Sequence, residues 1–203
     1  RNKMPEQSIE HIDDEYVDKD VRKLWLEKNQ IAKKIIAETQ TVLIQNLAPA
    51  LQSGGVENAI DFCNVNASKL TKSLENQYNV KISRRAFKYR NPINMAQEEE
   101  FKPMIEQFME SPDSNYVIAE DHEALKNMKF KKSNEVRIYK AIFTQPACVQ
   151  CHGQVGRDIK LSDYELIKKR YPEDKAIDFE VGDLRGFWEV IFDLNKNVED
   201  FSK

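Results

Sequence analysis

The chain has 203 residues and a mass of 23.7 kDa, which fits a single domain of ordinary size. Hydrophobic residues make up 40% and charged residues 32%, so there is enough apolar material for a core inside a strongly charged surface. The formal net charge of -3 argues against a nucleic-acid partner, because binding phosphates requires a basic excess. No apolar run approaches the roughly 18 residues of a membrane-spanning helix, so we expect no membrane span.

We expect residues 1–19 to form a polar arm and residues 20–203 to form one domain. From about residue 20 to residue 51, apolar residues recur at intervals of three or four, which predicts a long amphipathic helix. Ser53, Gly54 and Gly55 end this helix. A second helix is predicted after them, with a buried face made of Ala59, Ile60, Cys63, Ala67, Leu70 and Leu74.

The pattern changes to that of strands after Asn76. Val80 and Ile82 mark a strand that leads into a basic run and a turn at Asn91-Pro92. Residues 101–109 return to helical spacing. The segments that begin at Tyr116 and Glu135 are rich in β-branched and aromatic residues and therefore predict two further strands.

The C-terminal part is expected to contain one more helix and a hairpin. Residues 162–170 predict a short helix that begins at Ser162. Residues 179–194 predict a closing hairpin with its turn at 182–186. One face of this hairpin would carry Trp188, Val190, Phe192 and Leu194. Two helices followed by short helices and antiparallel strands predict an α+β domain.

Residues Cys148-Val149-Gln150-Cys151-His152 form C-x-x-C-H, the attachment signature of c-type haem. The two thiols add across the haem vinyl groups to form thioethers, and the adjacent imidazole binds one axial position of the iron. Two intervening residues let both sulfurs reach one edge of the porphyrin. The motif therefore predicts one covalently attached haem c, with His152 as a ligand of the iron.

A redox disulfide and half of a zinc site are the alternatives for this motif. A thioredoxin-like pair belongs at a helix N-terminus in a βαβ setting, whereas here a predicted strand precedes the pair and Gly153 follows the histidine. Structural zinc usually needs a second ligand pair, and the chain offers only Cys63, His11 and His122, which are not paired in sequence. Haem is the interpretation that the motif favours.

Residue type alone does not decide which residue is the second axial ligand of the iron. Two thioethers leave Cys63 as an odd thiol, which either packs as a small apolar residue or binds the iron as a thiolate opposite His152. The competing ligands are His11, His122 and the five methionines, of which Met104 and Met109 lie on a helical apolar face.

Arginines of the basic run that follows the first predicted strand are candidate partners of the haem propionates. A guanidinium group offers a planar pair of donors that matches a carboxylate. The candidates are Arg84, Arg85 and Arg90, with Lys88 in the same run. The alternative is a solvated strand face without a ligand.

Four sequence blocks in a fixed order resemble a known family: AIDFCNVNA around Cys63, SRRAFKYRNPIN, CVQCHG and YPEDKAIDFEVGDLRGFWEV. Over about residues 30–194 the chain resembles extracytoplasmic c-type haem domains with a PAS-like fold, which occur alone or at the sensor end of signalling proteins. The resemblance implies an antiparallel sheet with a long N-terminal helix and a second helix packed on it. It also implies that Cys63 ligates the iron opposite His152. The chain departs from the family pattern at Ser68, at Ala96-Gln97 and at Asp178-Phe179.

From the motif and the resemblance we expect a haem-based sensor or ligand-binding domain that responds to redox state or to a diatomic gas, NO or CO. A thiolate opposite an imidazole stabilises ferric iron and lowers its potential, which suits sensing. The alternative is a monohaem cytochrome that exchanges electrons with a redox partner. No histidine–acid pair can be identified around the motif, so we do not expect an enzyme.

Location and partners follow from the same chemistry. Bacterial haem c is attached outside the cytoplasm, so we expect a periplasmic or otherwise extracytoplasmic protein with a cleaved signal or an anchor before Arg1. The chain contains no output domain. We therefore expect any signal to pass to a signalling partner or through a homo-oligomer.

Overall fold

The structure is a computed structural model that describes residues 19–96, 101, 104, 105, 108, 109, 115–119 and 135–194. Apart from Lys19, the expected arm lies outside the described residues, and so do His11 and His122. Among the helices that the structure describes, none is both long and apolar enough to cross a membrane.

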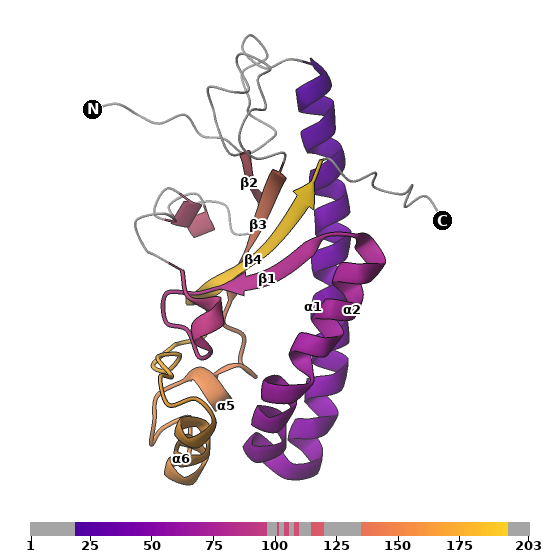
Figure 1. Ribbon diagram of the computed structural model, residues 1–203. Coiled ribbons are helices and arrows are strands. Elements are labelled where there is room, and N and C mark those ends of the chain that lie inside the picture. Colours follow the sequence, from indigo (N-terminus) through magenta and orange to yellow (C-terminus); the bar gives the residue numbers. More distant parts are fainter. Residues whose placement is uncertain are drawn as a thin grey trace, which may run out of the picture.

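Two helices form the N-terminal half of the described chain (Figure 1). Helix α1, Lys19–Val65, bends at Gly54 and Gly55, and Gly55 has a φ of +64° that favours glycine. Helix α2, Ala67–Tyr78, follows at once and packs against the first part of α1, where Ile36 and Leu43 share a buried cluster with Leu74. The glycine break is confirmed, but the predicted second helix is divided at Asn66, so Cys63 lies at the end of α1.

The sheet has four antiparallel strands in the order β1-β4-β3-β2. Their bounds are β1 Lys81–Arg85, β2 Asn115–Ala119, β3 Glu135–Phe143 and β4 Leu184–Asp193. The strands predicted near Val80, Tyr116 and Glu135 are confirmed. The hairpin predicted over 179–194 is wrong, because β4 is a single strand paired with both β1 and β3. Backbone groups of Asp178 and Phe179 instead bond to the C-x-x-C-H loop.

Alternating residues of the sheet contact two helical layers. Trp188, Val190 and Phe192 face α1 and α2, with Ile138 of β3 beside them. Leu194 packs against the same cluster, as predicted. Phe187 and Tyr139 point to the opposite face and pack against Phe101, Met104 and Phe108. The described residues between 101 and 109 are helical. The antiparallel sheet between helical layers is the predicted α+β, PAS-like arrangement.

Short elements complete the part of the fold that surrounds the site. They are the 3₁₀ turn Pro92–Asn94 (η2), helix α5, Val149–His152, and helix α6, Leu161–Arg170. Helix α6 begins one residue before Ser162, and Lys160 precedes it as the N-cap residue, so the expected start at Ser162 is wrong. Ile60 of α1 packs with Ile159, Ile167 and Tyr171. This contact holds the segment after the C-x-x-C-H motif against the part of α1 that carries Cys63.

Candidate functional site

The C-x-x-C-H motif forms a single helical turn after β3. The amide groups of Cys151 and His152 both donate to the carbonyl oxygen of Cys148, at 3.1 and 2.9 Å. Positions three apart on a helical turn lie on the same side, so Cys148 and Cys151 present their side chains together. Gly153 ends the turn, and a Cβ there would lie 2.7 Å from the carbonyl oxygen of Val149. The local fold thus gives both thiols a common direction, with His152 next to them.

The backbone of a later segment fixes the His152 ring. Nδ1 of His152 lies 2.8 Å from the carbonyl oxygen of Ala176. Since a carbonyl only accepts hydrogen bonds, Nδ1 must carry the proton and donate, which leaves the lone pair on Nε2. Burial, together with the positive charges of Arg90 and Arg185, holds the pKa of His152 well below its usual range. The ring is therefore the neutral imidazole that binds metals.

Residues 176–179 run along the motif and add two backbone bonds. The amide of Phe179 donates to the carbonyl oxygen of His152, and the amide of Asp178 donates to that of Gly153, both at 3.0 Å. The Phe179 ring meets the His152 ring edge-on, with centroids 6.4 Å apart. Asp178 has a φ of +59°, a conformation that aspartate tolerates better than most residues. The C-x-x-C-H motif and the later block of sequence at 171–190, which also resembles the haem family, thus form one structural unit.

Cys63 comes to this unit from α1. The Cys63 side chain is half-buried, and its pKa is raised by burial, against which the charges of Arg84 and Arg90 act. Burial and, to a smaller extent, the charge of Cys63 raise the pKa of Cys151 to about 11, although the charge of Arg90 opposes them. Burial and the Cys63 charge also raise the pKa of Tyr171 to about 12. Cys63 is therefore close enough to the motif to act on it electrostatically.

Arg90 links the motif to the segment that orients His152. Its Nη2 donates to the carbonyl oxygen of Cys151 at 2.6 Å and to that of Ala176 at 3.3 Å. The same guanidinium pairs with Asp174, at 3.2 and 3.3 Å from the two carboxylate oxygens. The Asp174 side chain is 0% exposed and that of Arg90 12% exposed, so the pair is buried. Arg90 thus lies at the site, but its Nε and Nη2 donors already have protein partners.

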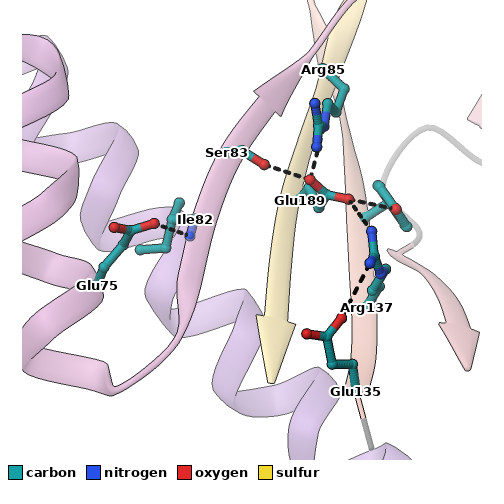
Figure 2. A network of polar contacts seen from close by, with 8 residues as sticks. Glu75, Ile82, Ser83, Arg85, Glu135, Arg137 and Glu189 are labelled. Carbon is teal, nitrogen blue, oxygen red and sulfur yellow. Dashed lines mark hydrogen bonds and ion pairs between the residues drawn. The ribbon is translucent and has the colours of Figure 1, made fainter. Parts of the chain in front are cut away.

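The other two predicted arginines lie on opposite faces of β1. The Arg84 guanidinium lies over the Trp188 ring at 5.8 Å, and its positive charge acts on both Cys63 and His152. Arg85 points to the other face, where its Nε lies 2.9 Å from a carboxylate oxygen of Glu189 (Figure 2). Arg84 and Arg90 therefore lie near the cysteines, whereas Arg85 belongs to a separate polar network.

The sequence analysis missed Arg185, because it treated 182–186 as a turn. Arg185 lies in β4 and its guanidinium carbon is 5.2 Å from the centre of the Phe179 ring. Lys88 approaches the same ring, with Nζ at 4.4 Å. The only feature of the sequence that pointed to Arg185 was its positive charge within the family-like block at 171–190. Asp174 and the Ala176 carbonyl were missed as well, since backbone acceptors and buried counterions have no motif.

Of the five methionines considered as ligands, Met4 and Met128 lie outside the described residues. Met104 is 1% exposed and packs in the core on the opposite face of the sheet. Met109 is 61% exposed. Within the described ranges, no group of three or more His, Cys, Asp or Glu side chains is arranged to hold a metal ion.

The residues present fit a haem c. Cys148 and Cys151 share one side of a turn, and His152 offers Nε2 as a neutral donor. The buried Nε of Arg185 has no hydrogen-bond acceptor among the described residues. Such an orphaned cationic donor beside a haem-attachment motif is consistent with an acidic group of the cofactor.

Comparison with known proteins adds two findings. The profile of the family described as Tll0287-like matches residues 16–192. Among solved structures, the chain is similar to the cyanobacterial heme-protein Tll0287, with 23% sequence identity and a TM-score of 0.56. The match covers 82% of this chain and 95% of that chain, which supports the fold described above. No curated protein matches.

Proposed function

Since the chain belongs to the Tll0287-like family and brings Cys63 to a Cys-x-x-Cys-His loop, we propose that it is an extracytoplasmic c-type haem protein that senses redox state or a diatomic gas. Cys148 and Cys151 would hold one haem through thioethers, and His152 would provide an axial ligand through Nε2. Bound haem supplies an iron that changes oxidation state and accepts a diatomic gas at an open axial position. The related structure is that of a heme-protein, which supports the choice of cofactor.

The position of Cys63 is the observation that carries the sensor proposal. As a thiolate, Cys63 is a strong donor to ferric iron, and as a neutral thiol it is a weak one. Arg84 and Arg90 favour the thiolate, whereas burial raises the pKa of Cys63 and favours the thiol. If Cys63 binds the iron as a thiolate, uptake of a proton would convert it to the weaker thiol donor and favour its release. A releasable ligand suits a sensor of NO, CO or redox state better than a fixed electron carrier.

The proposal includes no catalytic step and leaves the output to another molecule. The described groups that act on His152 include Arg84, Arg90, Arg185, the Phe179 ring and the Ala176 carbonyl, and the proposal gives none of them a catalytic role. A redox partner, a signalling protein or a second copy of the chain would receive the signal. The extracytoplasmic location is part of the proposal, because bacterial haem c is attached there.

Covalent attachment is tested on protein produced with a bacterial haem c maturation system. We expect acid–acetone treatment to leave the haem on the wild-type chain. The double variant Cys148→Ser/Cys151→Ser should release any haem it retains, whereas Cys63→Ala should keep it, since the third cysteine forms no thioether. Extraction of the haem from wild-type protein would contradict the proposed function.

A further inference from the structure

The guanidinium group of Arg185 has a hydrogen-bond acceptor on one side but not on the other. Nη1 donates to the carbonyl oxygen of Lys88 at 3.0 Å. Nε is buried and finds no acceptor among the residues that the structure describes. A buried donor without a partner is energetically unfavourable, more so when it is charged, and therefore calls for an explanation. Because Nη1 is occupied, the edge formed by Nε and Nη2 remains for an acceptor with two oxygens.

The charges around Arg185 also lack balance. Burial, together with the positive charges of Arg90 and Arg84, lowers the pKa of Arg185 to about 10. Arg90 is neutralised by Asp174. Neither Arg84 nor Arg185 has a carboxylate within ion-pair distance in the described part of the chain. Three guanidinium groups thus share one region with a single buried carboxylate partner, which leaves excess positive charge for an anion.

Arg185 is placed beside the haem-attachment loop. Its guanidinium lies over the Phe179 ring, and that ring contacts the edge of His152. The positive charge of Arg185 lowers the pKa of His152, and the pKa of Arg185 in turn responds to Cys148. An anion on the Nε–Nη2 edge would therefore lie next to the group that Cys148 and His152 hold.

We propose that Arg185 binds a haem propionate through the edge formed by its Nε and Nη2 atoms. Bidentate pairing of a guanidinium with a carboxylate would supply the acceptor that Nε lacks and a second acceptor for Nη2. The assignment replaces Arg85, which faces the other side of the sheet and pairs with Glu189. It rests on the proposed function, because it requires that haem is attached at Cys148 and Cys151.

The proposal is tested on holoprotein with Arg185→Gln, Arg185→Lys and the control Arg170→Gln, which removes an exposed guanidinium paired with Asp61. The readouts are the propionate bending band in resonance Raman spectra and the pH dependence of the midpoint potential. An adjacent cation lowers the pKa of a carboxylate by about 1–3 units, so Arg185→Gln should raise the pH at which the midpoint responds by a similar amount. The Raman band should shift as well.

Arg185→Lys separates charge from geometry. Lysine keeps the positive charge but lacks the paired N–H donors of the guanidinium group. The Raman band should therefore still shift, while the pH dependence of the midpoint potential should change less than in Arg185→Gln. Both readouts should be unchanged in Arg170→Gln. If the Gln and Lys variants carry covalent haem and match wild type in band and profile, the assignment of Arg185 is wrong. Loss of covalent haem from wild-type protein would instead contradict the proposed function itself.

Discussion

His152 donates from Nδ1 to the carbonyl oxygen of Ala176 at 2.8 Å, so the ring of the candidate axial ligand is oriented by the backbone. No side-chain substitution at position 176 removes that oxygen. The residues that position it are more sensitive: Asp174 accepts the amide of Ala176 at 3.0 Å, and Arg90 donates to the Ala176 carbonyl. The orientation of His152 therefore depends on a buried ion pair that does not touch the ring.

Replacing Arg90 tests how much this buried ion pair contributes to stability. Arg90→Leu leaves the carboxylate of Asp174 buried without its cation, and breaking a buried pair in this way costs about 3–5 kcal/mol. We expect the free energy of unfolding in urea to fall by about 3 kcal/mol. The control Arg170→Gln breaks an exposed pair with Asp61 and should cost less than about 1 kcal/mol. Equal losses in the two variants would contradict the role assigned to Arg90.

Cys63→Ala tests the second axial ligand. The thioethers are untouched, so the variant should keep its haem, but loss of a thiolate donor should raise the midpoint potential and give a high-spin or otherwise ligated ferric iron. Visible and EPR spectra with a redox titration measure this. Wild-type protein should give a low-spin ferric spectrum and bind CO or NO when reduced. Unchanged spectra in the variant would make Cys63 a buried core residue and favour the electron-transfer alternative.

Glu189 should make the free energy of unfolding decrease at acid pH. Burial alone would raise the pKa of Glu189, but hydrogen bonds from Ser83 and Tyr139 and the charge of Arg85 outweigh it and lower the pKa (Figure 2). A lowered folded-state pKa means that the stabilisation is present above the unfolded value of about 4.5 and is lost as the pH falls through the folded value. Urea unfolding between neutral pH and about pH 3 measures the loss.

Glu189→Gln removes this titration, so its stability should change less with pH than that of wild type, and it should be about 1–3 kcal/mol less stable at neutral pH. The control Glu173→Gln replaces an exposed carboxylate and should follow the wild-type curve. A Glu189→Gln curve parallel to that of wild type would show that the network does not contribute to the pH dependence.

Gly186→Ala should weaken the pairing of β4 with β1. A Cβ at position 186 would lie 2.3 Å from the carbonyl oxygen of Arg85, so one of the strands must shift. Overpacking of this kind costs about 1–3 kcal/mol, and urea unfolding should show a loss of that size. A variant as stable as wild type would mean that the two strands separate at this point without cost.

Local patterns determined much of the secondary structure and the core of the candidate site. The segment from Glu135 to Phe143 is a strand in sequence and structure alike, because β-branched and aromatic residues favour a half-buried pleated surface. The break at Gly54 and Gly55 was predicted because glycine ends helices. The turn that presents Cys148, Cys151 and His152 is contained in five consecutive residues, so its role could be predicted without long-range contacts.

Only the tertiary structure decided which distant side chains reach that turn. Arg84 and Arg85 are adjacent and chemically equal, yet alternation along β1 sends one toward Cys63 and the other to Glu189. A shift of one residue in the pairing with β4 would exchange the two, and polar residues at both positions carry no signal of the register. Arg185 is skipped where β3 pairs with β4, because Ile142 pairs with Gly186 and Phe143 with Leu184, so its direction depends on this irregularity and not on simple alternation. Its neighbourhood is set by the pairing of β4 and by the course of residues 176–179, neither of which is encoded by a local pattern.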